Sequence, residues 1–141
     1  MKTKILILCT GNSCRSQMAE GFLNTLSENI EAFSAGTKPA EQVNPFAIKA
    51  MNEVGIDLSS NKPEHTDAYI NESFDYVITV CGNAQENCPV FLGDVKEQLH
   101  IGFDDPADAT GTDEEIMSEF RRVRDEIERD FKKFYEERIK G

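Results

Sequence analysis

The sequence lacks several features that would indicate whole classes of protein. No stretch reaches the roughly 18 apolar residues of a membrane-spanning helix, and the apolar run near the N-terminus is too short for a signal peptide. Only 15 basic residues stand against 26 acidic ones, a formal net charge of −11. Nucleic acids and anionic membranes bind clustered basic residues, so we expect neither as a partner. We expect a cytoplasmic location.

Histidine is scarce, and zinc-type cysteine spacings are missing. His65 and His100 have no evident metal-binding partners, and Cys81 and Cys88 are spaced too widely for a zinc site. The sequence shows no internal repeat or low-complexity stretch, and 141 residues suit a single domain, 1–141. In the expected compartment, four cysteines indicate catalysis or metal binding rather than a structural disulfide framework.

Strand-like and helix-like segments alternate along the chain, which predicts an α/β fold with a parallel sheet. The expected strands cover residues 4–9, 31–34, 75–81 and 100–103. The expected helices cover residues 16–28, 45–54 and 112–139, with a short helix near 67–71. Asn44 and Gly55 are typical of the N-cap and C-cap of the second helix.

Cys9 closes the first expected strand and Arg15 precedes the first expected helix, an arrangement typical of an oxyanion site with a nucleophile at its floor. The backbone N–H groups of such a loop form a nest for an anion, and the helix N-terminus adds positive charge. The Arg15 guanidinium fits two oxygens of a tetrahedral anion. This environment favours attack by Cys9 as a thiolate.

The expected anion-binding residues are Thr10, Gly11, Asn12, Ser13, Cys14 and Arg15. The alternative is a buried strand-end cysteine followed by an ordinary Gly-Asn turn. The strand before the loop and the helix after it disfavour that alternative. Ser16 is expected to donate a hydrogen bond to the Cys9 sulfur, to cap the helix, or to do both. Cys14 is expected to be a bystander.

Two further segments are expected at the same edge of the sheet, because ligands of parallel sheets sit at the carboxyl ends of the strands. Asp105 follows the fourth expected strand and is the candidate general acid, with Pro106 fixing its direction. The alternative for this pair is an ordinary Asp-Pro turn. Cys81 closes the third expected strand, and a polar, glycine-bearing tether joins it to Cys88. Such a tether favours thiol–disulfide exchange, and the alternative is two inert buried cysteines.

The loop at residues 9–21 resembles that of thioredoxin-coupled arsenate reductases, a family built on the low-molecular-weight tyrosine phosphatase fold. The likeness continues in order through residues 34–36, 44–45, 80–82, 88–89, 102–107 and 121–127. It implies a four-stranded parallel sheet flanked by helices. The Cys81/Cys88 pair separates a reductase from a plain phosphatase of this fold.

The resemblance also implies a three-cysteine relay. Cys9 attacks arsenate, and Asp105 helps water to leave. Cys81 then attacks the Cys9 sulfur and releases arsenite, and Cys88 attacks Cys81 to move the disulfide outward. Thioredoxin or a similar dithiol protein resets the enzyme. Residual phosphatase activity, no required cofactor and a monomeric state are expected.

Some members of this family bind a potassium ion near the loop. Matching positions here are Asn12, Glu20 and Ser34. The remaining acidic ligand falls in a divergent stretch, where Glu64 and Asp67 are the candidates.

Two other functions remain open at this point. A phosphatase acting on phosphotyrosine or a small phosphate ester would use Cys9, Arg15 and Asp105. Cys81 and Cys88 would then have only a protective redox role. The small and acidic residues after Pro106 disfavour a tyrosine-directed enzyme, which usually presents aromatic residues there. A non-catalytic oxyanion-binding or thiol-sensing regulator would bind anions without turnover.

Overall fold

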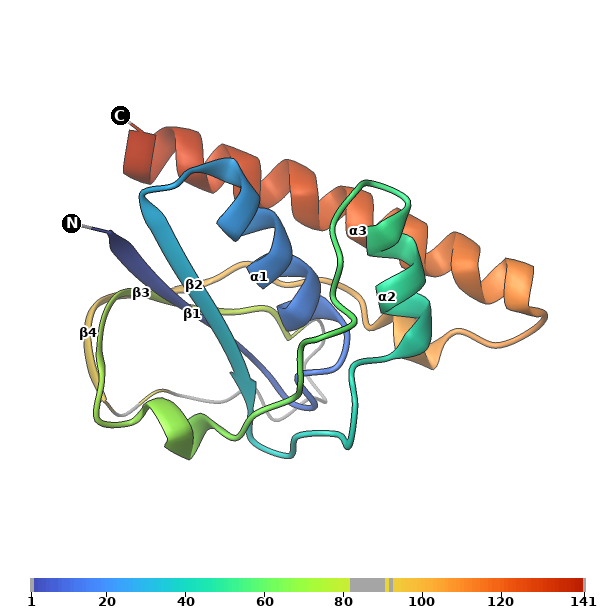
Figure 1. Cartoon of the computed structure of the whole chain (residues 1–141), viewed down its shortest axis with the longest axis horizontal. Coiled ribbons are helices and arrows are strands. Elements are labelled where there is room, and N and C mark those ends of the chain that lie inside the picture. Colours follow the sequence, from blue (N-terminus) through green and yellow to red (C-terminus); the bar gives the residue numbers. More distant parts are fainter. Residues whose placement is uncertain (1, 82–90, 92, 141) are drawn as a thin grey trace.

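A four-stranded parallel sheet forms the centre of the molecule (Figure 1). The structure, a computed structural model, describes residues 2–81, 91 and 93–140. The strands are β1 (Thr3–Cys9), β2 (Ile30–Gly36), β3 (Ser73–Thr79) and β4 (Asp94–His100), in the spatial order β2-β1-β3-β4. The predicted fold class is confirmed, and β1, one of the two inner strands, carries Cys9 at its carboxyl end.

In the described part of the chain, three α-helices and two short 3₁₀ helices surround this sheet. They are α1 (Arg15–Leu26), α2 (Pro45–Asn52), α3 (Asp113–Phe134), η1 (Thr66–Tyr69) and η2 (Pro106–Asp108), and a π-helical turn, η3 (Tyr135–Lys140), continues α3. The predicted N-cap of α2 is confirmed, since Asn44 Oδ1 accepts from Phe46 N–H. The predicted C-cap is wrong, because Glu53 caps the helix; Gly55, at φ +83°, lies in the turn that follows and donates its N–H to Asn52 O.

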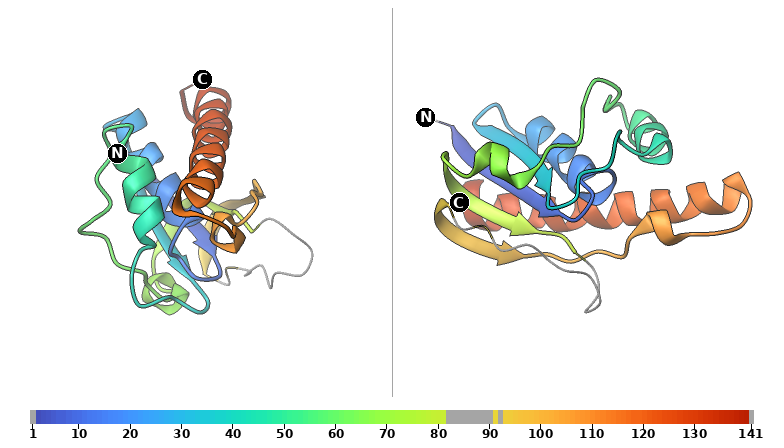
Figure 2. Two further views of the ribbon diagram at one scale, coloured as in Figure 1. Left: turned by 90° about the vertical axis from the view of Figure 1, so that its right-hand side faces the viewer. Right: turned by 90° about the horizontal axis from the view of Figure 1, so that it is seen from below.

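The alternating side chains of β1 divide the apolar core into two layers. Ile5 and Ile7 belong to the larger cluster, which the helices cover, whereas Leu6 and Leu8 belong to a smaller cluster that includes Tyr69 of η1. In the right-hand view of Figure 2, η1 lies on the near side of the sheet and α3 on the far side. Neither core layer covers the carboxyl ends of the strands, so loops can lie there.

The expected strand over residues 100–103 is wrong, because the fourth strand lies earlier, at Asp94–His100. This strand is at the sheet edge, and its side chains alternate between exposed and half-buried positions. An edge strand needs few apolar residues, so its sequence lacks the apolar run that predicted the others. Phe103 N–H still donates to Val80 O at 3.2 Å, so the chain continues beside β3 after β4 ends.

Candidate active site

The loop between β1 and α1 has its carbonyl groups turned outward. The carbonyl oxygens of Thr10, Gly11 and Ser13 accept from the backbone N–H groups of Lys38, Ala40 and Asn44, each at 2.9 Å. In a trans peptide the N–H group points opposite to the carbonyl. The N–H groups of Gly11, Asn12 and Cys14 therefore face the inner side of the loop, as anion binding requires.

The conformation of this loop depends on Asn12. It is 1% exposed and has φ +51°, in the left-handed region that few residues other than glycine adopt. Its Nδ2 donates to Ser16 Oγ at 2.8 Å, and its Oδ1 accepts from Gln17 Nε2 at 3.2 Å and from Glu64 N–H at 2.9 Å. These bonds hold the turn that brings the inner N–H groups together.

Gly36 lets the loop pack closely against the end of β2. A Cβ atom at this position would lie 2.3 Å from Thr10 O and 3.0 Å from Asn12 N. Any side chain here would displace the loop, so the glycine is required by close approach of two backbones.

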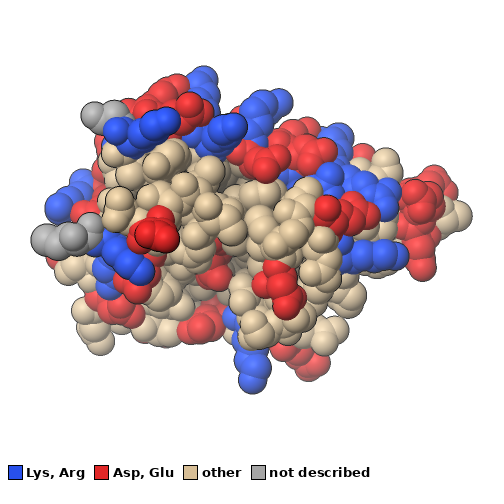
Figure 3. Space-filling view, turned by 45° about the horizontal axis from the view of Figure 1, so that its top comes forward, with Lys and Arg blue, Asp and Glu red and all other residues tan. Residues whose placement is uncertain are grey.

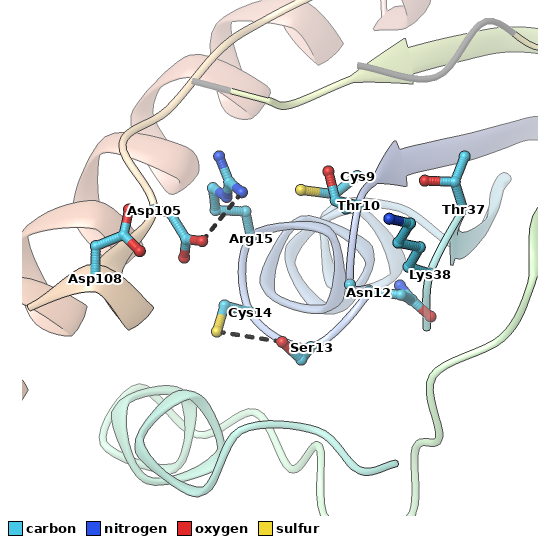
Figure 4. A pocket seen from close by; sticks show the side chains of 11 residues that line it. Cys9, Thr10, Asn12, Ser13, Cys14, Arg15, Thr37, Lys38, Asp105 and Asp108 are labelled. Carbon is cyan, nitrogen blue, oxygen red and sulfur yellow. Dashed lines mark hydrogen bonds and ion pairs between the residues drawn. The ribbon is translucent and has the colours of Figure 1, made fainter. Parts of the chain in front are cut away.

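The loop surrounds a cavity of about 420 Å³. Its described lining residues are Cys9, Thr10, Gly11, Asn12, Ser13, Cys14, Arg15, Thr37, Lys38, Asp105 and Asp108. Figure 4 shows the Cys9 thiol on one side of the loop and Arg15 directed toward Asp105. Cys9 and Arg15 are each 3% exposed. Thr10 Oγ1 is buried with no hydrogen-bond partner among the described residues, so it is available to a bound anion.

Arg15 and Asp105 form the charged pair at this cavity. Arg15 Nη2 lies 3.5 Å from Asp105 Oδ2, and Arg15 Nη1 donates to Phe103 O at 3.0 Å. Asp105 Oδ1 accepts from Ala107 N–H at 3.0 Å, so the Asp-Pro turn and the acid position are both present. The structure brings the predicted acid to the predicted arginine across a large sequence separation.

Cys14 and Ser16, the two remaining residues of the loop region, have different surroundings. Burial, the largest influence, raises the pKa of the Cys14 thiol to about 12, which fits its expected bystander role. Ser16 is the second residue of α1 and does not cap it, so that alternative is wrong. Its hydroxyl accepts from Asn12, and donation to Cys9 stays a prediction.

Cys81 lies two residues beyond β3, next to the strand that carries Cys9. The register of the two strands sets Leu8 against Thr79, and Val80 N–H donates to Leu8 O at 3.0 Å. Both cysteines belong to the larger core cluster, and Cys81 is 2% exposed. Cys88 lies outside the described residues, so its role stays a prediction.

Only some of the residues that were predicted to bind potassium lie at one cavity. Glu20, Ser34 and Glu64 line one cavity, and Ser34 Oγ donates to Glu20 Oε1 at 2.9 Å. Asn12 does not line it. Asp67 has an exposed side chain beside His65, so Glu64 is the better candidate for the acidic ligand. Among the described residues, no group of three or more His, Cys, Asp or Glu could hold a metal ion.

Sequence reasoning missed two residues of the site. Gln17 is 2% exposed and donates from Nε2 to both Asn12 O and Asn12 Oδ1. Its signal was a polar residue in the first turn of an expected helix, next to the anion-binding loop. Lys38 lines the cavity, and its signal was a cation just after an expected strand, at the edge where ligands bind.

A parallel α/β sheet with a thiol, an arginine and an inward-facing N–H loop at one edge defines a thiol-based oxyanion site. The low molecular weight phosphotyrosine protein phosphatase family matches residues 4–140, and the chain belongs to this family.

Relatives of this chain are similar over nearly its full length. An arsenate reductase of Shouchella clausii is 52% identical over 136 residues, which are 96% of each chain. An arsenate reductase of Bacillus subtilis is 49% identical over 138 residues, which are 96% of this chain and 98% of the relative. A solved arsenate reductase in the phosphate binding state has a TM-score of 0.79 and 31% identity, with 97% of this chain and 98% of the other covered.

Proposed function

We propose that this chain reduces arsenate to arsenite by a three-cysteine relay. The observation that carries the proposal is the placement of Cys9 and Cys81 at the carboxyl ends of two neighbouring parallel strands, within one buried cluster. The relatives that are about half identical over nearly the whole chain are arsenate reductases, which supports this substrate.

The first step forms a bond between Cys9 Sγ and arsenic. The inward N–H groups and Arg15 hold the arsenate oxygens and offset their charge, which is greatest in the transition state. One oxygen leaves arsenic as water after Asp105 delivers a proton to it. Arsenic is still in its higher oxidation state, bound to the protein as a thioester-like adduct.

The second step carries the electrons. The Cys81 thiolate attacks Cys9 Sγ, forming a sulfur–sulfur bond and breaking the sulfur–arsenic bond. The electron pair of the broken bond stays on arsenic, which leaves as arsenite, while the two thiols are oxidised to a disulfide. Cys88 then attacks Cys81, and a dithiol protein of the thioredoxin class reduces the resulting disulfide.

The cavity favours a small inorganic anion over an aryl phosphate. None of its described lining residues is aromatic, whereas recognition of a phosphotyrosine ring would use such side chains. Hydrolysis of small phosphate esters is a residual activity of the same loop, because its transition state carries a similar charge.

A reducing compartment is required for the relay to be reset, so we place the protein in the cytoplasm. We also propose that the protein acts as a monomer. No helix among the described residues is long and apolar enough to cross a membrane.

A single-turnover experiment tests the relay. Fully reduced protein is mixed with arsenate in the absence of any reductant, and arsenite and remaining thiols are measured. The wild type is expected to release arsenite in proportion to protein and to lose thiols. Cys81→Ser should release none and still hydrolyse para-nitrophenyl phosphate, while Cys14→Ser should behave like the wild type. Arsenite release by Cys81→Ser would overturn the relay.

We also propose that a potassium ion binds beside Glu20. The donor set fits a monovalent cation, since Glu20, Ser34 and Glu64 offer oxygen atoms to one cavity of about 340 Å³. The ion would supply charge compensation for the half-buried Glu20 carboxylate. Potassium chloride should raise the Tm of the wild type by about 3 °C relative to choline chloride at equal ionic strength. Glu20→Gln should lose this difference, and an equal response in both proteins would contradict the site.

A further inference from the structure

Lys38 is fixed at the mouth of the anion cavity by its own backbone. Its N–H group donates to Thr10 O at 2.9 Å, two residues after β2 ends at Gly36. Pro39 follows it and restricts its backbone to extended conformations. The side chain lines the cavity, and Figure 4 shows its amine turned toward the loop that holds Cys9.

The charge of Lys38 is not offset by a neighbouring carboxylate. Its amine has no ion pair with any described residue, whereas Lys4, Lys96 and Lys133 each have one. Arg15, the other cation that lines the cavity, is already engaged by Asp105.

The surroundings of the cavity are otherwise unfavourable for an approaching anion. Asp105 and Asp108 both line it, and the whole chain carries a net charge of −11. A cation at the mouth would offset this repulsion where the anion enters.

We propose that Lys38 is a specificity-determining residue that attracts doubly charged tetrahedral oxyanions into this cavity. The inference deepens the proposed function, on which its choice of substrate rests. Lys38 acts on binding and leaves the chemical steps to Cys9, Arg15 and Asp105. Its attraction scales with the charge of the anion, so a dianion gains more from it than a monoanion of similar shape.

The test measures anion binding without turnover. Sulfate and perchlorate, tetrahedral anions of charge −2 and −1, are titrated as competitive inhibitors of para-nitrophenyl phosphate hydrolysis at low ionic strength. Lys38→Gln should weaken sulfate binding about tenfold and perchlorate binding about threefold, and added salt should shrink both effects. Lys38→Arg should restore wild-type binding.

Lys49→Gln is the matched control, since Lys49 is an exposed lysine of α2 outside the cavity and the change in net charge is the same. It should bind both anions as the wild type does. In arsenate turnover, Lys38→Gln should raise KM with kcat unchanged.

Equal losses for sulfate and perchlorate in Lys38→Gln, no loss at all, or a fall in kcat would overturn the proposal. Its failure is distinguishable from failure of the proposed function. Wild-type protein that binds sulfate in a Lys38-dependent way without reducing arsenate would refute the reductase and leave the anion-selective role of Lys38 standing.

Discussion

At the scale of single residues, two cysteines of one loop differ in reactivity because their surroundings differ. Cys9 ends β1 and lines the cavity with Arg15. Cys14 starts the turn into α1, where burial raises its pKa to about 12. At neutral pH Cys14 therefore stays a thiol, which is a poor nucleophile.

Alkylation should separate these two cysteines. Below about pH 10, well under its raised pKa, Cys14 should resist iodoacetamide in the folded protein, while Cys9 reacts and phosphate protects it. Mass spectrometry of peptides after limited labelling measures both sites. Cys9→Ser should abolish arsenate reduction and ester hydrolysis, whereas Cys14→Ser should keep at least about half of each activity. Preferential labelling of Cys14 would contradict this assignment.

Asn12 combines a strained backbone with a side chain that has several partners. Asn12→Gly keeps the left-handed conformation and removes only the side-chain bonds, and Asn12→Ala removes the bonds and adds strain. We expect Asn12→Ala to be less stable than Asn12→Gly by about 1 kcal/mol. Urea unfolding measures this difference. Equal stability of the two variants would mean that the loop relaxes out of the left-handed region.

At the scale of elements, the sequence predicted those whose residues are mostly buried or clearly capped. The apolar runs of β1 and β3 predicted strands, and the periodic apolar stripe of α3 predicted a helix. Thr112 and Glu115 form a capping box at the start of α3. The edge strand β4 was missed, because a half-exposed strand lacks a continuous apolar run. Gly36 ends β2, and its contact with Thr10 depends on tertiary packing, which no local pattern contains.

Two glycines at element ends should respond differently to alanine. Gly36→Ala places a Cβ 2.3 Å from Thr10 O, so the loop must move, and phosphate binding should weaken at least about tenfold. Gly55→Ala meets no atom within 4 Å but strains a φ of +83°. It should cost about 1 kcal/mol of stability with phosphate binding intact. Calorimetric titration and urea unfolding measure the two effects, and unchanged phosphate binding in Gly36→Ala would contradict the loop packing.

At the scale of the whole molecule, the charged surface can be followed on one face. Figure 3 shows basic and acidic side chains interspersed on the face that includes α3. Arg122, for example, contacts Asp104, Glu119 and Glu126. The sequence predicted that Cys9, Arg15 and Asp105 lie together, because strand ends of a parallel sheet meet at one edge. It could not predict the bonds of Gln17 or the place of Lys38, which depend on how separate loops pack.

Glu20 should make the stability of the molecule depend on pH. Burial, with the nearby Glu64 carboxylate, raises the pKa of Glu20, so the folded state holds this proton more tightly than the unfolded state. The stability that protonated Glu20 contributes is present at low pH and is lost as pH rises through the folded pKa. Relative to Glu20→Gln, the wild type should become less stable between about pH 4 and pH 7 in potassium-free buffer. Urea unfolding across this range measures it, and parallel profiles would contradict the raised pKa.

The relay depends on the attack of Cys81 on the Cys9–arsenate adduct, which leaves an electron pair on arsenic. The most direct test is arsenate-dependent NADPH consumption with thioredoxin and thioredoxin reductase, run on wild type and Cys81→Ser beside para-nitrophenyl phosphate hydrolysis. Arsenate should drive NADPH consumption only when Cys81 is present, while ester hydrolysis should survive the removal of Cys81. Wild-type protein that hydrolyses the ester but consumes no NADPH with arsenate, with thioredoxin or with glutaredoxin and glutathione, would contradict the relay.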